Sequence, residues 1–209
     1  MTGAEMVVKT LEKNGVKVVF GYPGAANCPI IDKLSFSSIK HILTRNEQGA
    51  AHMASGYARV TKQAGVCTAT SGPGATNLIT GIATAYMDSI PMVALTGQVA
   101  TKLIGKDAFQ EVDITGATLP FTKHSYLIKD GLDIPRVVNE AFHIANTGRP
   151  GPVLIDFPMD LLKKEFDYPD EDEDVNIRGY KLMGKANESQ VKKVAEAIKG
   201  AKKPVILAG

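Results

Sequence analysis

The sequence predicts an α/β fold, in which a mostly parallel sheet of about six strands is covered by helices on both faces. Short apolar runs typical of buried strands recur along the chain, and segments with helical spacing separate them. Glycine and proline clusters lie between the two kinds of segment. Strands that alternate with helices in this way pair in parallel, because each helix returns the chain to the same end of the sheet. We therefore expect a doubly wound sheet.

The individual elements follow in a regular order. Thr2 and Glu5 form a capping box for a first helix, and Gly15 closes that helix. The expected helices are 5–14, 29–34, 48–62, 75–87 and 133–146. The expected strands are 16–20, 39–44, 66–70, 92–96, 123–128 and 153–157. A loop with one helical turn fills 98–119, and we expect the strands to follow a flavodoxin-like order.

Composition changes after this first domain, which we assign to residues 1–162. Residues 163–187 contain the acidic run 170–174 and no apolar period, which is typical of a linker between domains. A helix at 189–201 and a strand at 205–208 then open a second α/β domain, assigned to 188–209. One helix and one strand cannot bury a core, so we expect the sequence to be a fragment of a longer protein.

The overall composition excludes several classes of protein. The 209 residues carry 24 basic and 22 acidic side chains, a net charge of +2, which gives no bias toward nucleic acid. No apolar run approaches the roughly 20 residues that span a membrane, and the N-terminus has no apolar signal core. The two cysteines lack metal or disulfide spacing. We expect no metal ligands in this chain, no nucleic-acid or membrane partner, and a cytoplasmic location.

Glu47 is the first candidate for chemistry, because it lies where the expected strand 39–44 gives way to the helix 48–62. Ligands of open α/β sheets collect outside the carboxyl ends of the strands. A carboxylate there, walled by Gly49 and two alanines, can exchange a proton with a nitrogen of a ligand. The alternative is a glutamate placed at a helix start only because the helix dipole favours it.

The segment Ser71-Gly72-Pro73-Gly74 is a second candidate, because it precedes a helix after another expected strand. Taken alone it suggests a phosphate cradle at a helix N-terminus. No Gly-Lys-Ser/Thr follows, so it is not a Walker loop, and one Gly-x-Gly is too little for a dinucleotide fingerprint. Contact with another part of a ligand and a purely structural turn are the remaining possibilities.

Six segments taken together make the sequence resemble the thiamine-diphosphate enzymes, in particular the large catalytic subunits of the acetolactate synthase family. No single segment would suffice, but their order is highly specific. They are GYPG at 21–24, EQGAAHMASGYAR at 47–59, TSGPGATN at 70–77, PMVALTGQV at 91–99, DAFQEVDI at 107–114 and GRPGPVLID at 148–156. The resemblance covers the first domain, which would be the N-terminal, pyrimidine-binding domain of that family.

This resemblance implies roles for particular residues. Glu47 matches the family carboxylate that hydrogen-bonds the cofactor's pyrimidine and favours its reactive imino tautomer. The loop at 71–74 would lie along the pyrimidine, since the diphosphate is held by another domain. Arg149 matches an arginine placed against FAD, which suits its paired donors; the alternative is a solvated loop arginine. The cofactor-binding residues implied are Glu47, Tyr22, Pro23, Gly24, Ser71, Pro73, Asn77 and Arg149.

Phe109 and Gln110 match family positions near the substrate. Gln110 would act as a catalytic residue that hydrogen-bonds a carbonyl or hydroxyl, and Phe109 would form an apolar wall. The alternative is an ordinary loop pair with Phe109 in the core. The implied reaction decarboxylates pyruvate and joins the remainder to a second 2-oxo acid, giving 2-acetolactate for branched-chain amino acids.

The resemblance also implies cofactors and partners. The cofactors would be thiamine diphosphate, Mg²⁺ with its ligands outside this chain, and FAD. A homodimer or homotetramer would form through this domain, and a small regulatory subunit is possible. Two alternatives remain open. One is another thiamine-diphosphate lyase, of the glyoxylate carboligase or sulfoacetaldehyde type; the other is a non-catalytic dimerisation module of the same fold.

Overall fold

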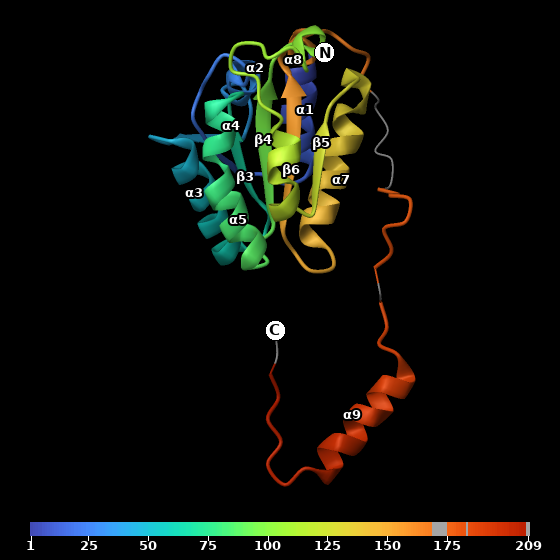
Figure 1. The fold of residues 1–209 in the computed structure, drawn as a ribbon. Helices are drawn as coiled ribbons and strands as arrows, with labels where there is room; N and C mark the ends of the chain where they lie inside the picture. The colour runs from blue at the N-terminus through green and yellow to red at the C-terminus, as the bar shows by residue number, and fades with distance from the viewer. Residues whose placement is uncertain (169–174, 183, 208–209) are drawn as a thin grey trace. The chain divides into compact units, whose positions relative to one another are not determined.

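The computed structural model describes residues 1–168, 175–182 and 184–207, which fall into two compact units, Met1–Ile177 and Arg178–Gly209. The first unit is built on a six-stranded sheet in which every neighbouring pair is parallel, in the order β2-β1-β3-β4-β6-β5 (Figure 1). The α/β class and the parallel sheet are therefore confirmed.

Three of the four interior strands form the middle of the core. Every residue of β3, β4 and β6 is buried, whereas the edge strands β2 and β5 are partly exposed. This distribution follows from sequence, because a strand covered by helices on both faces must be apolar almost throughout. The strands are β1 (Val18–Gly21), β2 (Lys40–Leu43), β3 (Gly65–Ala69), β4 (Met92–Gln98), β5 (His124–Leu127) and β6 (Pro152–Pro158).

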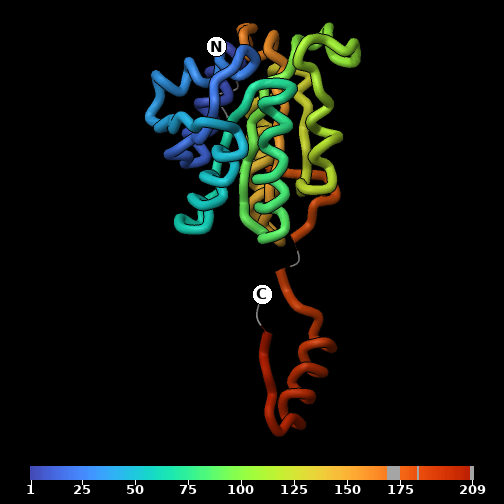
Figure 2. The backbone as a smooth tube through the Cα atoms, turned by 60° about the vertical axis from the view of Figure 1, so that its left-hand side comes forward, coloured from blue at the N-terminus to red at the C-terminus, as the bar shows by residue number. Residues whose placement is uncertain are grey.

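Helices cover both faces of the sheet. One group packs around α1 and the other around α3, and α3 lies beside α5 in both views (Figures 1 and 2). The first group is α1 (Gly3–Lys13), α2 (Cys28–Leu34), α7 (Ile134–Asn146) and α8 (Met159–Lys163). The second is α3 (Glu47–Thr61), α4 (Pro73–Asn77), α5 (Ile79–Met87) and α6 (Ile114–Thr118). Short 3₁₀ turns are η1 (Thr101–Leu103), η2 (Leu119–Phe121) and η3 (Gly131–Asp133).

The strand order agrees with the flavodoxin-like expectation over β2-β1-β3-β4, and then the last two strands are exchanged. The last strand of the chain, β6, pairs with β4 over seven residues, and β5 lies outside it at the edge. Burial explains the exchange, since all of β6 is buried while β5 has an exposed histidine and three half-buried residues. The more apolar strand occupies the inner position.

The helix expected over 75–87 is two helices in the structure. At Leu78 the backbone N–H bonds to the carbonyl of Ala75, three residues back, and this tighter turn ends α4. Helix α5 then begins, with Ile82 N–H bonded to the Leu78 carbonyl. The capping box at the first helix is confirmed, because Thr2 and Glu5 exchange both of its hydrogen bonds.

Near the end of the first unit, Glu165 and Phe166 contact its first two residues. Met1 and Phe166 exchange two backbone hydrogen bonds, each of 2.9 Å, and Thr2 forms a bridge with Glu165. Residues up to Ile177 group with this unit, and the domain boundary at 162 stays a prediction. The acidic run at 170–174 lies outside the described residues.

The second unit contains the expected helix, α9 (Glu188–Gly200), which Asn187 caps. The strand expected at 205–208 is not formed over 205–207, and residue 208 lies outside the described residues. A strand needs a neighbour to bond with, and the described residues of this unit contain no other extended segment that pairs with it. That this unit opens a further domain stays a prediction.

Candidate functional site

Glu47 lies beyond the carboxyl end of β2 as the first residue of α3. The preceding Asn46 has an extended backbone, and its side chain accepts a 2.6 Å hydrogen bond from Gly49 N–H, which fixes the start of the helix. Although it begins a helix, the Glu47 side chain does not extend into water, because only 9% of the residue is exposed. Asn46 serves as the cap, so Glu47 is not required for that task.

Asn77, at the end of α4, holds this carboxylate. Its Nδ2 donates to Glu47 Oε2 over 3.0 Å. Gly74, from the same helix, faces the other oxygen: a Cβ added there would lie 3.2 Å from Glu47 Oε1 and 2.7 Å from Thr70 Cγ2. A side chain at this position would therefore crowd both Thr70 and the carboxylate. Thr44, three residues before Glu47, is also buried, and its hydroxyl oxygen has no hydrogen-bond partner in the described part of the chain.

The loop that contains Tyr22, Pro23 and Gly24 follows β1 and packs on Thr70, the residue that follows β3. A Cβ at Gly24 would lie only 2.4 Å from Thr70 Cβ, so a glycine is needed for this approach. The Thr70 hydroxyl accepts a 3.1 Å hydrogen bond from Ala26 N–H. Tyr22 and Pro23 are exposed, whereas Gly24 is half-buried.

Asn27 supports this loop and was missed by the sequence reasoning. It is fully buried, accepts from Gly24 N–H over 2.8 Å, and donates to the Tyr22 carbonyl over 3.2 Å and to Thr68 Oγ1 over 3.3 Å. An asparagine just before a helix start could have been noted as a loop anchor, since its amide bonds both donors and acceptors.

The loops after β1 and β3 meet where the strand order reverses. The chain passes from β1 to β2 on one side and then returns to β3 on the other. Ligands of doubly wound sheets bind at such a switch point, outside the carboxyl ends of the strands. The structure brings Glu47, Asn77, Ser71 and Gly24 to this edge; Ser71 is buried there, whereas Pro73 is exposed.

The backbone of Gln110 contacts the loop 71–74 at Gly72. A Cβ at Gly72 would lie 2.6 Å from the Gln110 carbonyl oxygen, so the two backbones are in direct contact. Gln110 itself has φ of 58°, a left-handed conformation that non-glycine residues rarely adopt and that costs about 1–3 kcal/mol. The segment 70–77 therefore touches the Glu47 carboxylate at Gly74 and the Gln110 backbone at Gly72.

Phe109 is 88% exposed, so the alternative that placed it in the core is wrong. The turn that carries it is closed by Glu111, whose carboxylate accepts from Ala108 N–H over 2.8 Å and from Gly105 N–H. These backbone bonds hold the pKa of Glu111 below its ordinary value, and the bond from Ala108 has the largest effect. The turn presents Phe109 outward on a fixed backbone.

Asp156 is a buried carboxyl at this edge that the sequence reasoning also missed. It lies near the end of β6, is 1% exposed, and accepts from Thr96 Oγ1 over 2.7 Å and from Gln98 Nε2 over 2.8 Å. Burial raises its pKa to about 7. An aspartate inside an otherwise apolar strand was the available signal, because a charged residue is rarely buried without partners.

Arg149 is not part of this site. It lies before β6, at the amino-terminal edge of the sheet, and donates to Ser89 Oγ over 2.8 Å. Its Nη2 also donates to the carbonyls of Tyr86 and Met87 over 3.3 and 3.2 Å. It therefore bonds the last carbonyls of α5, which an isolated helix end leaves without partners.

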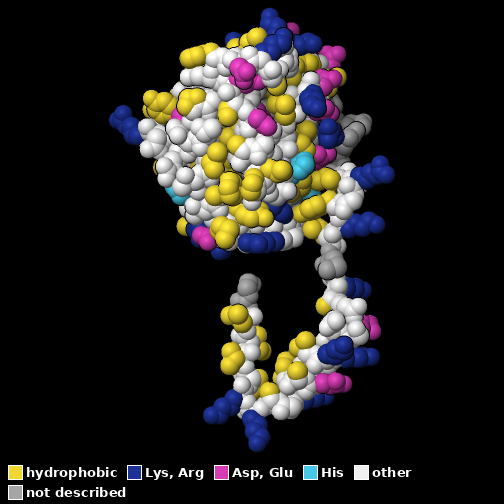
Figure 3. Space-filling view, in the orientation of Figure 1, with side chains coloured by type: hydrophobic (Ala, Val, Ile, Leu, Met, Phe, Trp, Pro, Cys, Tyr) yellow, Lys and Arg dark blue, Asp and Glu magenta, His cyan; other side chains and the backbone are white. Residues whose placement is uncertain are grey.

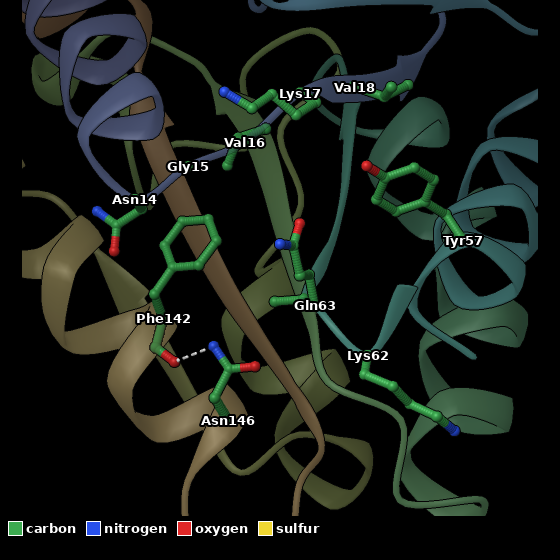
Figure 4. A pocket seen from close by; sticks show the side chains of 11 residues that line it. Asn14, Gly15, Val16, Lys17, Val18, Tyr57, Lys62, Gln63, Phe142 and Asn146 are labelled. Atoms are coloured by element: carbon green, nitrogen blue, oxygen red, sulfur yellow. Dashed lines mark hydrogen bonds between the residues drawn. The ribbon is translucent and has the colours of Figure 1, made fainter. Parts of the chain in front are cut away.

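A pocket does open at that same amino-terminal edge, between β1 and the ends of α3 and α7 (Figure 4). Its side chains include Lys17 and Lys62, which point away from each other, and Asn146, which donates to the Phe142 carbonyl over 2.9 Å. None of the sequence-predicted site residues lines it. We therefore place the candidate site at the opposite, carboxyl edge.

Among 1–168, 175–182 and 184–207, no three or more His, Cys, Asp or Glu side chains are grouped in a way that could hold a metal ion. Within the same ranges, no helix combines the length and the apolar character that crossing a membrane requires.

Comparison with known proteins assigns the chain to a family. Residues 1–117 match the family model of the thiamine pyrophosphate enzyme, N-terminal TPP binding domain. The whole chain is 55% identical to a probable acetolactate synthase large subunit of Methanocaldococcus jannaschii, of which it covers 36%. It is 54% identical to an acetolactate synthase of Mycobacterium bovis and 51% identical to one of Arthrospira platensis, covering 34% and 37% of them.

The chain thus spans about a third of the length of the curated relatives that it matches. The matched family region contains β1 to β4, Glu47, Asn77 and the loops that meet at the switch point. On the match and on this geometry together, the chain belongs to the thiamine pyrophosphate enzymes and contains their N-terminal TPP binding domain.

Proposed function

We propose that this chain is the N-terminal part of an acetolactate synthase and contributes the pyrimidine-binding half of its active site. The observation that carries the proposal is the buried Glu47 carboxylate, held by Asn77 at the switch point and packed beside Gly74. In the complete enzyme, pyruvate would be decarboxylated and joined to a second 2-oxo acid, as the names of the similar proteins suggest.

The residues present fit the pyrimidine end of thiamine diphosphate. Glu47 Oε1 lies beside Gly74, which has no side chain to cover it, and the Thr44 hydroxyl is a buried polar atom without a hydrogen-bond partner among the described residues. There Glu47 would accept and return a proton at a ring nitrogen, and Asn77 would keep its other oxygen in place. When bound, the cofactor supplies the carbon nucleophile that decarboxylation of a 2-oxo acid requires.

The loop at 71–74 would contact the pyrimidine rather than a phosphate. The Gln110 carbonyl oxygen packs against Gly72, the N-cap of α4, and an acceptor there disfavours an anion at the helix start. Ser71 and Pro73, with Tyr22, Pro23 and Gly24 opposite, would line the ring. The diphosphate and Mg²⁺ would be held by residues outside this chain, and so we expect the chain alone to be inactive.

Gln110 and Phe109 would face the substrates. Both are exposed in this chain, on a backbone fixed by Gly72 and by Glu111. Gln110 would hydrogen-bond an oxygen of the second 2-oxo acid, and Phe109 would cover it once a facing surface is present. Arg149 would contact FAD in addition to its bonds to the end of α5.

Association would occur through the face that α5 covers, where hydrophobic side chains gather (Figure 3). Met87 in α5 is 72% exposed and Val60 in α3 is 84% exposed, and α3 packs against α5. Exposed apolar clusters of this kind mark interaction sites. We also propose that the complete enzyme forms a homodimer or homotetramer, binds a small regulatory subunit and is located in the cytoplasm.

A non-catalytic module of the same fold is disfavoured, because it has no use for a buried carboxylate held by Asn77.

The first test replaces Glu47 by glutamine in the longer enzyme that carries this chain. Glutamine keeps the shape of the side chain but cannot exchange a proton, and the loss of a positioned acid or base costs about 10²–10⁴-fold in turnover. Acetolactate formation from pyruvate, with saturating thiamine diphosphate and Mg²⁺, is the measurement. The matched control is Glu196→Gln on the exposed surface of α9, which should leave turnover unchanged.

Product analysis separates the alternatives. Turnover of Glu47→Gln within about threefold of the parent would exclude the assigned role. If the enzyme forms tartronate semialdehyde from glyoxylate, or acts on sulfoacetaldehyde, and gives no acetolactate, another lyase of the family is the correct reading. If neither protein binds thiamine diphosphate in calorimetry, the chain belongs to a non-catalytic module.

A further inference from the structure

The buried Asp156 carboxyl has no part in the proposed chemistry, yet its contacts lead to the loop that carries Phe109 and Gln110. Its Oδ2 accepts from Gln98 Nε2 over 2.8 Å. The same Nε2 donates to the carbonyl of Val112 over 2.9 Å, and Gln98 Oε1 accepts from Val99 N–H over 2.8 Å. One amide thus joins Asp156 to both ends of the connection between β4 and α6.

Elsewhere the connection is held at Thr101, whose N–H and hydroxyl donate to Asp160, and at Val112, which packs against the hydrophobic core. On the loop itself, the Glu111 carboxylate bonds Gly105 and Ala108 of the same turn. The contact of Gln110 with Gly72 is a packing contact in a left-handed conformation. The bond from Gln98 to Val112 therefore ties the loop to the sheet, and Asp156 fixes the direction of the Gln98 amide. Without that acceptor, the amide keeps only its bonds to Val99 and Val112, so its direction is less firmly fixed.

We propose that Asp156 is a positioning residue, which acts through Gln98 to hold the loop Gly105–Val112 in the conformation that presents Phe109 and Gln110. The anchoring itself is a property of this chain. Only the consequence for the second 2-oxo acid rests on the proposed function.

The surroundings of Asp156 give the anchor a measurable signature. Burial raises the pKa of this carboxyl to about 7, while the bonds from Thr96 and Gln98 lower it and the charge of Asp113 raises it further. On the neighbouring strands it faces Thr96 and Gln98 of β4 and is in register with Leu127 of β5, none of which titrates near neutral pH. Asp113 caps α6 and its pKa is lowered, so it stays ionised near neutrality.

Both protonation states of Asp156 are compatible with the fold. When ionised, it accepts charge-assisted bonds from Thr96 and Gln98. When protonated, it can donate to Thr96 Oγ1, which in turn lies 3.5 Å from the Ile155 carbonyl. The bond from Gln98 then becomes one between neutral groups, which is weaker by about half. We therefore expect the loop to be held more firmly above pH 7 than below it.

The test uses the 209-residue chain in solution, followed by NMR. Between pH 5.5 and 8.5, the Gln98 side-chain amide and the Val99 N–H should titrate with a midpoint near 7 in the parent chain. Asp156→Asn keeps the shape of the side chain and should abolish that titration. Asp88→Asn, an exposed aspartate at the amino edge, is the matched control and should leave it unchanged.

Hydrogen exchange of the loop amides is the second readout. After correction for intrinsic rates at pH 8, Asp156→Asn and Gln98→Met should each accelerate exchange over 105–112 by about fivefold to tenfold, the loss of one modest hydrogen bond. Amides of β3 should keep their protection, which shows that each variant is folded. Unchanged exchange over 105–112 in both variants, or a titration that persists in Asp156→Asn, overturns the proposal.

Kinetics in the longer enzyme separates the two proposals. Asp156→Asn should change the kcat/KM ratio between two competing 2-oxo acids and leave the dependence on thiamine diphosphate unchanged. If exchange responds as expected but the enzyme makes no acetolactate, the anchor stands and the proposed function fails. If acetolactate is formed but exchange over 105–112 is unaffected, the proposed function stands and Asp156 is not the anchor.

Discussion

At the scale of single residues, Asp156 makes the stability of the fold depend on pH. Its pKa in the folded chain, about 7, lies above the ordinary value of 3.8. Its contribution to stability is therefore fully present below about pH 4 and is lost as pH rises through 7. The difference corresponds to at most roughly 4 kcal/mol. Asp156→Asn cannot ionise, so relative to the parent chain it should gain stability by a large part of this amount between pH 4 and pH 8.

Urea denaturation of both chains at several pH values measures this effect, and only the difference between them matters, since all other titrating groups are shared. A difference that stays constant from pH 4 to pH 8 would mean that Asp156 ionises freely in the folded chain. A difference that grows in favour of the parent at high pH would show a carboxylate stabilised by its two donors.

At the scale of elements, the packing of α5 on α3 depends on the absence of a side chain at Gly81. A Cβ there would lie 2.4 Å from Ala51 Cβ and 3.2 Å from its carbonyl carbon. Gly81→Ala should therefore lower the free energy of unfolding by about 1–3 kcal/mol. Gly56→Ala is the matched control, because it is an exposed helical glycine of α3 with nothing within 4 Å, and it should raise stability by about 0.5–1 kcal/mol. Thermal unfolding that shifts the same way in both variants would contradict this packing.

The elements also show what the sequence could reveal and what it could not. Strands with continuous apolar runs, such as β3 and β4, were placed within about two residues, since burial on both faces leaves a clear pattern. The exchange of β5 and β6 was not foreseen, because strand order depends on long-range pairing that no local pattern reports. The strand expected at 205–208 failed over 205–207 for the same reason, since the described part of the second unit supplies no partner.

In the candidate site, too, features with a local sequence signal could be predicted, whereas features that depend on long-range contacts could not. Glu47 was found because a carboxylate at a strand-to-helix junction is a local signal, and the resemblance gave it a role. Its bond from Asn77 joins residues 30 positions apart and could only be seen in the folded chain. Asn27 and Asp156 were missed since their importance lies in contacts with other loops and strands.

At the scale of the whole molecule, the exposed apolar face of α3 and α5 predicts self-association. Met53, Val60 and Met87 are 44%, 84% and 72% exposed, which is unusual for three large apolar side chains on two packed helices. Sedimentation velocity of the chain should show a concentration-dependent dimer, and Val60→Lys with Met87→Lys should weaken it at least tenfold. Phe36→Lys, an exposed apolar residue outside α3 and α5, should leave the dimer intact. A monomer at all concentrations would mean that this face needs another part of the protein.

The paired backbone bonds between Met1 and Phe166 mean that the two ends of the sheet unit are already neighbours. A short glycine bridge could join them without moving either strand or helix, and new termini could then be opened at the exposed turn Lys62–Gln63, on the edge away from Glu47. Such a circularly permuted chain would keep the whole candidate site, while its N- and C-termini would lie at the turn Lys62–Gln63. The position of the chain termini would therefore not determine the geometry of the site. What matters is that the first and last residues of the unit lie side by side.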